Sequence, residues 1–193
     1  MNGLGSGLSI RNVINILTGP VHSGKTTFLK NTIPLLRGRN FEIDGYLSEA
    51  IWKNKEFFGY DLVDLKDHRY HPFIRKQGQQ DWQRIGLFFF LSETLDIAKK
   101  IIHRSKKADL CVVDEVGPLE LTGKGVWPAL KDVLMIPEQG VLLVVRESIL
   151  KNFMEKIQRD DFVVYDIEQN KKPLRMAKSL MKDLEKRKKS EQK

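Results

Sequence analysis

The feature that most constrains the fold of this chain is the stretch GPVHSGKTT at 19–27. It matches the phosphate-binding loop pattern G-x-x-x-x-G-K-[ST], with Gly19, Gly24, Lys25 and Thr26 at the fixed positions. An apolar run, VINIL, precedes the loop, and apolar residues at helical spacing follow it. Strand, loop and helix in this order are the setting that the motif requires. The stretch therefore predicts a phosphate site rather than a plain strand-to-helix turn.

The composition of this loop suits a nucleoside triphosphate bound with Mg²⁺. Glycine lets the backbone N–H groups approach phosphate oxygens, and the N-terminus of the following helix adds further donors. Lys25 is expected to contact the β- and γ-phosphates during catalysis, and the Thr26 hydroxyl is expected to bind Mg²⁺. His22 varies freely under the pattern and is expected only at the mouth of the site. The expected nucleotide-binding residues of the loop are Gly19, Pro20, Val21, His22, Ser23, Gly24, Lys25, Thr26 and Thr27.

An apolar run that ends in two acids, CVVDE at 111–115, predicts the second half of the site. Such a strand brings its acids to the carboxyl edge of a parallel sheet, beside the phosphate loop. We expect Asp114 to hold Mg²⁺ and Glu115 to be the catalytic base that positions water against the γ-phosphate. For Glu115 the alternatives are a supporting residue or a surface ion pair.

Strand and helix patterns alternate along the chain, which predicts an α/β fold with parallel βαβ units. Three strand patterns follow the first helix and predict an antiparallel insertion, with a polar turn at 53–56. A polar connection at 77–83 comes next, and Ser92 is expected to cap a helix. The expected strands are 13–17, 41–52, 57–65, 70–75, 109–113, 141–145 and 162–166. The expected helices are 26–36 with fraying at Pro34, 93–107, one after Gly125, 148–158 and 174–187.

The formal net charge of +8 belongs mainly to the C-terminal segment. Residues 171–193 carry ten basic and three acidic side chains, so the first 170 residues are almost neutral. A nucleic-acid partner would favour a basic face on the folded body, and we do not expect one. The expected divisions are a flexible leader at 1–11, one domain at 12–187 and a basic flexible tail at 188–193.

The single cysteine and the hydropathy pattern favour a cytoplasmic protein. Cys111 is alone, so the chain has no internal disulfide and fits a reducing compartment. The first residues lack the pattern of a secretory signal, and no apolar run is long enough to span a bilayer. We therefore expect no membrane partner.

Other phosphate-loop proteins remain as alternatives. Asp114 to Gly117 also fits the D-x-x-G element of GTPases, but the guanine-reading N-K-x-D is missing, because the NKKP sequence at 170–173 ends in proline. A small-molecule or nucleotide kinase shares the loop, although no arginine-rich lid segment is evident between 114 and 141. A nucleotide-dependent adaptor that assists cofactor assembly would bind a triphosphate tightly and turn it over negligibly.

Several segments together resemble a known family. The segments ILTGPVHSGKTT, GYLSEAI, FGYDLVDL and CVVDEVGPLEL resemble the P-loop nucleoside-triphosphatases known from thermophiles and, as the cancer-related nucleoside-triphosphatases, from animals. The resemblance runs from about Val13 to Asn170. It implies a P-loop three-layer α/β sandwich with a mostly parallel sheet, RecA-like or kinase-like, and an inserted antiparallel hairpin. It also implies slow, Mg²⁺-dependent hydrolysis of nucleoside 5′-triphosphates, such as ATP or GTP, with broad base tolerance.

The resemblance implies roles for further residues. Lys25, Thr26, Asp114 and Glu115 match the triphosphate and metal residues of the family. Glu49 matches an acid at the end of the family's second strand, which implies a place facing the site, with a surface acid as the alternative. Asn170 matches an asparagine that helps to enclose the base, while Lys171 replaces the family's arginine. Arg146 stands where the family often has no arginine; it could stabilise charge on the phosphates or form an ion pair.

Overall fold

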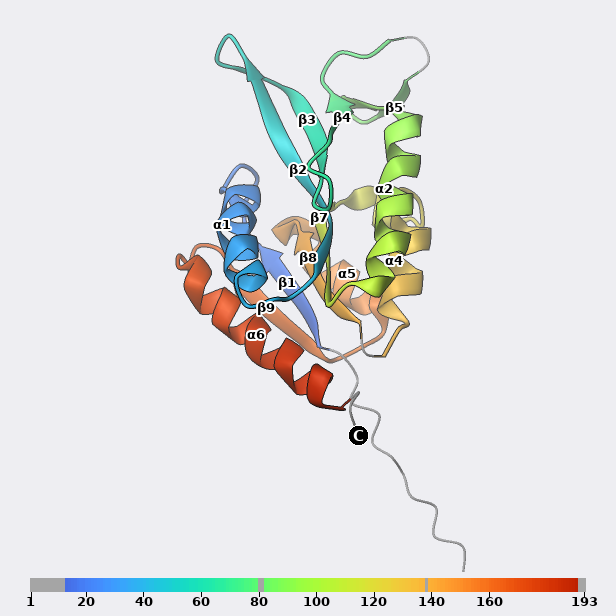
Figure 1. Cartoon of the computed structure of the whole chain (residues 1–193). Coiled ribbons are helices and arrows are strands. Elements are labelled where there is room, and N and C mark those ends of the chain that lie inside the picture. The colour runs from blue at the N-terminus through green and yellow to red at the C-terminus, as the bar shows by residue number, and fades with distance from the viewer. Residues whose placement is uncertain (1–12, 80–81, 138, 191–193) are drawn as a thin grey trace, which may run out of the picture.

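The computed structural model describes residues 13–79, 82–137 and 139–190. Its strands form one nine-stranded sheet in the order β5-β6-β4-β3-β2-β7-β8-β1-β9 (Figure 1). The strands are β1 (Ile14–Thr18), β2 (Ile43–Lys53), β3 (Glu56–Asp64), β4 (Tyr70–Arg75), β5 (Gln83–Ile85), β6 (Phe88–Phe90), β7 (Leu110–Val116), β8 (Gly140–Val145) and β9 (Phe162–Asp166). The α-helices are α1 (Lys25–Arg37), α2 (Ser92–Arg104), α3 (Pro118–Leu121), α4 (Trp127–Leu134), α5 (Leu150–Ile157) and α6 (Pro173–Ser190), and short 3-10 turns are η1 (Ser105–Lys107) and η2 (Glu147–Ile149).

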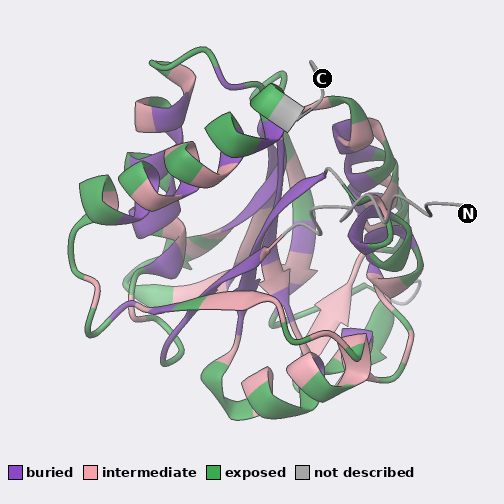
Figure 2. Cartoon of the chain, turned by 90° about the horizontal axis from the view of Figure 1, so that it is seen from below, coloured by how far each residue is buried: buried purple, intermediate pink, exposed green. Residues whose placement is uncertain are grey.

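The parallel part of the sheet contains β2, β7, β8, β1 and β9. Helices α1 and α6 cover one face of it, and α2, α4 and α5 cover the other (Figure 1). Continuous apolar strands such as β8 are buried along their whole length between these layers (Figure 2). Two hydrophobic clusters result, one on each face of the sheet. The expected three-layer α/β fold is confirmed.

The antiparallel part extends the sheet beyond β2. In Figure 1 the tip of the β2–β3 hairpin rises above the helices, while β4 lies beside the upper part of α2. The β2–β3 hairpin turns through Asn54 and Lys55, whose φ angles of 51° and 66° lie in the left-handed region. The turn is therefore two residues long, and Lys53 and Glu56, which we assigned to a four-residue turn, belong to the strands. Polarity alone does not tell a turn residue from an exposed strand residue.

Several helix boundaries differ from the sequence expectations. Ser92 is the first residue of α2 and not its N-cap, which is Leu91, and α2 ends at Arg104 where the chain tightens into η1. Helix α1 continues through Pro34, because Ile33 and Leu36 on either side are buried in the core. Part of the polar connection and the apolar run after it form the β5–β6 hairpin, and the four-residue helix α3 was not expected.

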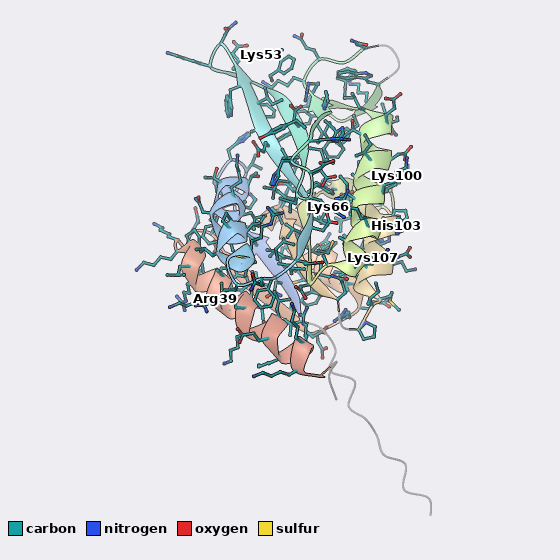
Figure 3. All side chains as sticks on the ribbon, viewed as in Figure 1. Arg39, Lys53, Lys66, Lys100, His103 and Lys107 are labelled. Atoms are coloured by element: carbon teal, nitrogen blue, oxygen red, sulfur yellow. The ribbon has the colours of Figure 1, made fainter. Side chains whose placement is uncertain are left out.

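The last helix reaches into the expected basic tail. Lys188 Nζ lies 2.9 Å from Asp109 Oδ2 and 5.0 Å from the centre of the Phe41 ring, so the end of α6 is held against the body. The expected flexible leader, and the tail beyond Ser190, lie outside the described residues. Other basic side chains lie apart from this helix end and from one another, such as Lys53 in β2, Lys100 in α2 and Arg39 in the turn after α1 (Figure 3). Among the described helices, none has the length and apolar character needed to cross a membrane.

Arg104 links the parallel and antiparallel parts of the sheet. From the end of α2, its Nη2 donates to Asp44 Oδ1 at 2.6 Å and to Asp64 Oδ1 at 2.7 Å. Asp44 is the second residue of β2 and Asp64 is the last residue of β3, and both carboxylates are buried. One guanidinium is therefore the counter-charge that two buried acids share.

Replacing Arg104 with leucine should lower the free energy of unfolding, because it leaves two buried carboxylates uncompensated. We expect a loss of about 3 kcal/mol, the lower end of the usual range, because the Arg104 side chain is 33% exposed. Urea unfolding measures this loss. Lys100→Leu, at an exposed position of the same helix, is the control and should change stability by less than about 0.5 kcal/mol. Equal effects of the two substitutions would contradict the bridging role.

Candidate active site

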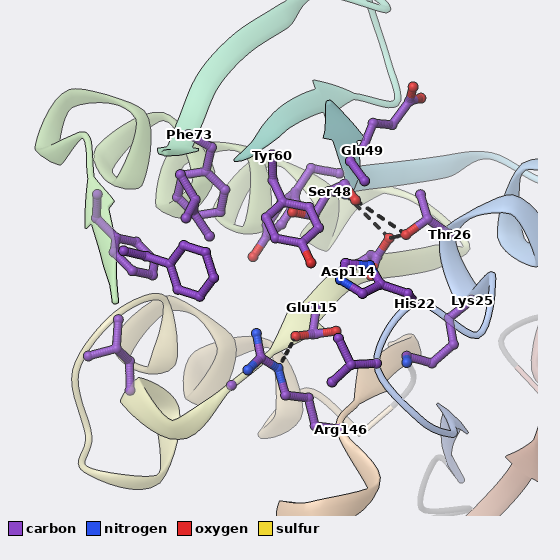
Figure 4. Close-up of a pocket in the computed structure, with 18 of the residues that line it drawn as sticks. His22, Lys25, Thr26, Ser48, Glu49, Tyr60, Phe73, Asp114, Glu115 and Arg146 are labelled. Carbon is purple, nitrogen blue, oxygen red and sulfur yellow. Dashed lines mark hydrogen bonds and ion pairs between the residues drawn. The ribbon is translucent and has the colours of Figure 1, made fainter. Parts of the chain in front are cut away.

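A cavity of about 760 Å³ opens where the phosphate loop meets the carboxyl ends of β2, β7 and β8 (Figure 4). Ligands bind at this edge in open α/β sheets. The cavity brings together Lys25 and Thr26 from the start of α1 with Asp114 and Glu115 from β7. Side chains that are far apart in the sequence thus share one wall of the cavity, as the two motifs predicted.

The loop before α1 depends on two glycines. Gly24 has a φ angle of 88° and immediately precedes Lys25, the first residue of the helix. Gly19 has a φ angle of 146°, and a Cβ there would lie 2.5 Å from Ile167 Cγ2. Side chains at these positions would be strained or would collide, so the loop can keep this path only with glycine.

Lys25 is bent back over its own loop. Its Nζ donates to the carbonyl oxygens of Gly19 at 3.0 Å and Pro20 at 2.6 Å. Burial lowers the pKa of the Lys25 amine, which means that its charged form is poorly solvated. A buried ammonium held by neutral carbonyl groups gains free energy when an anion approaches, so Lys25 is suited to bind phosphate.

Ser23 gives a second indication of an anion in the loop. Its Oγ is buried and has no hydrogen-bond partner among the described residues. An unsatisfied buried hydroxyl costs about 1–3 kcal/mol, so such groups are usually paired. A phosphate oxygen held by the loop would accept a hydrogen bond from Ser23.

Thr26 and Asp114 join α1 to the end of β7. Thr26 Oγ1 lies 2.7 Å from Asp114 Oδ2, and the Ser48 backbone N–H donates to the same oxygen at 3.3 Å (Figure 4). Burial raises the pKa of Asp114 to about 7, although the hydrogen bond from Thr26 opposes this rise. The carboxylate therefore lacks a full counter-charge, and a bound cation would supply one.

Two consecutive acids line the cavity because β7 is irregular at this point. In a regular strand, successive side chains point to opposite faces of the sheet. Asp114 pairs with Val144 of β8, whereas Val116 pairs with the very next residue, Val145. Glu115 is therefore an extra residue in a bulge, and it lines the same cavity as Asp114.

Arg146 follows β8 and forms an ion pair with Glu115 inside the cavity (Figure 4). The Arg146 and Glu115 side chains are 34% and 25% exposed. An ion pair was considered as an alternative for each of these residues separately; the structure pairs them with each other, within the site and not on the outer surface. It fixes the direction of the Glu115 carboxylate.

The oxygen atoms of Thr26 and Asp114 fit a magnesium ion. Mg²⁺ prefers hard oxygen ligands and usually takes one or two from the protein, with phosphate and water completing its shell. The described residues contain no group of three or more His, Cys, Asp or Glu side chains that could hold a metal alone. A metal at this place would therefore depend on the phosphates of a bound nucleotide.

Other predicted residues lie at the margin of the site or outside the cavity. Glu49 lines the cavity, but its carboxylate pairs with Lys30 at 3.0 Å and points away from Asp114 in Figure 4. Asn170 lies in the turn after β9, where its Nδ2 donates to the Asp166 carbonyl oxygen at 3.2 Å. The loop residues that line the cavity are Val21, His22, Ser23, Gly24, Lys25, Thr26 and Thr27; Gly19, Pro20 and Asn170 are not among the lining residues.

Comparison with known proteins gives the family. A family model described as NTPase matches residues 15–180. The chain belongs to this NTPase family. The nucleoside-triphosphatase THEP1 of Thermofilum pendens is 28% identical over 156 residues, which cover 79% of this chain and 85% of the relative. The cancer-related nucleoside-triphosphatase homolog of Bos taurus is 28% identical over 137 residues, which cover 65% and 71%.

Solved structures confirm the fold of this NTPase. The solution structure of a human cancer-related nucleoside triphosphatase superposes with a TM-score of 0.62 at 22% identity and covers 81% of this chain and 88% of that one. The crystal structure of THEP1 from Aquifex aeolicus gives a TM-score of 0.63 at 20% identity and covers 81% and 91%. The resemblance seen in the sequence is thus confirmed for family and fold.

The far half of the cavity was missed by sequence reasoning. Here the NTPase places rings and aliphatic side chains from the antiparallel strands and from α2 and α3. The run FFF at 88–90 was a signal, but it shows no helical or strand periodicity that would place it at a site. The lining residues of this half, which we call the aromatic half, are Tyr46, Trp52, Tyr60, Phe73, Ile74, Leu87, Phe88, Phe90, Leu95, Leu119 and Val126.

The raised pKa of Asp114 predicts a pH-dependent stability of the metal-free NTPase. Because the folded carboxyl has a pKa of about 7 and the unfolded one a value near 4, the fold favours the protonated form. The free energy of unfolding should therefore fall as pH rises from about 4 to about 7, by on the order of 3–4 kcal/mol.

Asp114→Asn should remove this contribution. Urea unfolding in EDTA at pH 5 and pH 8 measures the free energy of unfolding of the variant and of the wild type. In the difference between the two proteins, the contributions of other titrating groups cancel. The variant should gain stability relative to the wild type at pH 8, and less at pH 5. An equal difference at both pH values would contradict the raised pKa.

Proposed function

We propose that this NTPase hydrolyses nucleoside 5′-triphosphates to the diphosphate and phosphate, with Mg²⁺ as cofactor and broad tolerance for the base. One observation carries the proposal: Lys25, Thr26, Asp114 and Glu115 line a single cavity at the carboxyl edge of the sheet. These are the parts that phosphoryl transfer to water needs, namely a phosphate cradle, metal ligands and a group to position water. Membership of the NTPase family supports hydrolysis over the kinase and adaptor alternatives.

The phosphate loop would hold the triphosphate through its backbone N–H groups and Ser23. Lys25 would leave the carbonyl oxygens of Gly19 and Pro20 and contact the γ-phosphate, where its charge becomes better compensated. Thr26 and Asp114 would hold Mg²⁺, which supplies positive charge to the phosphates when bound. Asp114 is then stabilised as a carboxylate despite its burial.

Glu115 would position the attacking water. The water oxygen forms a bond to the γ-phosphorus while the bond from that phosphorus to the β–γ bridging oxygen breaks, and the nucleoside diphosphate leaves. The proton released by the water passes to Glu115 and then to solvent. Arg146, already paired with Glu115, would hold this carboxylate in place and remain close to the charge that develops on the phosphate oxygens.

The region expected at the base supports broad base tolerance. The turn after β9 packs on the phosphate loop through Ile167 and Gly19, so a nucleoside bound to the loop would lie near Asn170. The Asn170 amide already donates to the Asp166 carbonyl oxygen. One N–H of the Asn170 amide is thus used within its own turn, which leaves fewer groups for base-specific recognition. A cytoplasmic location completes the proposal and is supported by the free, buried thiol of Cys111.

Lys25→Ala should reduce phosphate release from Mg²⁺–ATP by at least about 30-fold, because it removes a charge-assisted contact worth about 2–3 kcal/mol in the transition state. Steady-state phosphate release measures the effect. Lys30→Ala is the matched control, since Lys30 lies at the cavity edge and pairs with Glu49. Equal rates for the Lys25 variant and the wild type would refute the phosphate-loop assignment.

Glu115→Gln should lower single-turnover phosphate release by about 10²–10⁴-fold, because glutamine can hydrogen-bond water but cannot accept its proton. Binding of a non-hydrolysable triphosphate analogue should be unchanged or slightly tighter. The matched control is Glu49→Gln, the same change at an acid of the same cavity that faces Lys30. A large loss in the Glu49 variant with near-normal turnover in the Glu115 variant would transfer the base role to Glu49.

A further inference from the structure

The whole cavity is larger than triphosphate hydrolysis requires, and the aromatic half is the part that hydrolysis does not use. A triphosphate and a water molecule need the loop, the two acids and Arg146, whereas the cavity continues to β4, the β5–β6 hairpin and α2. Figure 4 shows Thr26 and Lys25 on one side, Phe73 on the opposite side and Tyr60 between them. The whole volume of about 760 Å³ is within the range of about 300–1,000 Å³ that is usual for sites of small organic ligands.

The nucleobase is not the natural occupant of this half. The acids and Arg146 mark the γ-phosphate end of the bound triphosphate, and the aromatic half lies beyond them. The base is attached through the ribose at the α-phosphate end. The turn that contains Asn170 packs on the loop and is not part of the cavity lining. A second molecule is therefore needed to fill the aromatic half.

Rings dominate the walls of this half. Tyr46 and Phe73 meet edge to face with their centroids 6.4 Å apart, and Phe73 meets Phe90 in the same way at 6.0 Å. Phe57 links Tyr60 to Phe88, with centroid distances of 4.9 Å and 6.2 Å. Edge-to-face walls of this kind favour a planar aromatic guest, which can add further ring contacts.

Two tyrosine hydroxyls in the aromatic half have no partner. Within the described part of the chain, neither Tyr46 nor Tyr60 makes a side-chain hydrogen bond, whereas the hydroxyl of Tyr165 donates to Ser179 at 2.9 Å. Tyr46 is only 1% exposed, yet it lines the cavity. In Figure 4 the Tyr60 hydroxyl points toward Glu115. Neither hydroxyl oxygen is among the buried side-chain atoms of the described residues that lack a partner, so both open into the cavity, where a ligand with a donor or acceptor group can bond to them in place of water.

The charged side chains beside the aromatic half determine which charge its ligand can carry. Asp114, Glu115 and Glu120 line the cavity near the two tyrosines, and the basic side chain on that side, Arg146, is already paired with Glu115. Glu120 is buried and accepts hydrogen bonds from the backbone N–H groups of Gly117 and Val126. A negatively charged molecule would be repelled by these acids and by the γ-phosphate.

We propose that the aromatic half is a second binding site, for a small neutral molecule with a planar aromatic ring and a hydroxyl group. The ring packs against Phe73 and Phe88, and the hydroxyl bonds to Tyr46 and Tyr60. The second ligand and the nucleotide bind together, because the aromatic half lies beyond the acids and Arg146. This binding activity is separate from triphosphate hydrolysis, because the ligand can bind without any nucleotide.

Binding of indole-3-ethanol, followed by ligand-observed NMR in the absence of nucleotide, tests the site. We expect saturable binding to the wild type, and none for glycerol, which lacks a ring, or indole-3-carboxylate, which is charged. Tyr60→Phe and Tyr46→Phe should each weaken binding about 2- to 10-fold, the value of one hydrogen bond. Phe88→Ala, on the short outer strand β6, should weaken it by a similar factor.

Two controls keep the test decisive. Tyr70→Phe alters a tyrosine that is 59% exposed and absent from the cavity lining, and it should leave binding unchanged. Tyr60 is half-buried, so its variant remains informative if the Tyr46 variant, in the core, unfolds. Absence of saturable binding, or equal affinity of the Tyr60 variant and the wild type, would overturn the proposal.

A competition experiment separates the second site from a base pocket. Bound indole-3-ethanol should stay bound when a non-hydrolysable Mg²⁺–ATP analogue is added. Displacement by the analogue would show that the aromatic half holds the nucleobase, and the second site would be wrong. Because the first measurement uses no nucleotide, its failure leaves the hydrolysis proposal intact, and loss of hydrolysis in the Lys25 variant leaves this site intact.

Discussion

The site depends on the hydrogen bond between Thr26 and Asp114, which connects the start of α1 to the acids of β7. It joins the first turn of α1 to the end of β7, although β8 lies between β7 and β1 in the sheet. Asp114 is buried and its pKa is raised to about 7, so this contact is made at a cost in desolvation. A buried carboxylate of this kind lowers the stability of the fold. Its presence therefore favours a functional role, namely holding a cation.

The bulge in β7 places a second acid of this strand in the cavity. Without the register shift after Asp114, Glu115 would point to the opposite face of the sheet, away from the phosphate loop. Arg146, at the end of the neighbouring strand, then meets Glu115 inside the cavity. The antiparallel strands beyond β2 add a wall of rings to the same cavity. The site therefore has a polar half built by the parallel strands and an aromatic half built by the insertion.

Local patterns were enough to predict the parallel core and the phosphate loop. Strand β9 was predicted with its observed bounds, because polar residues on both sides of its apolar run mark where the strand begins and ends. The β5–β6 hairpin was not predicted, because three consecutive phenylalanines carry no periodicity. The Glu115–Arg146 pair depends on a bulge and a strand order that local patterns do not encode; an ion pair was considered for each residue separately, but their pairing with each other was not predicted. Glu49 was placed near the site by resemblance, but its pairing with Lys30 depends on side-chain direction.

A crystal structure with Mg²⁺ and a β,γ-imido triphosphate would test the hydrolytic site directly. We predict that Lys25 Nζ leaves the carbonyl oxygens of Gly19 and Pro20 and contacts the γ-phosphate. We also predict the metal on Thr26 and Asp114, and a water molecule between Glu115 and the γ-phosphorus. A complex in which Lys25 keeps its contacts to the loop, and the phosphates bind outside the cavity, would contradict the central claim that these residues form one hydrolytic site.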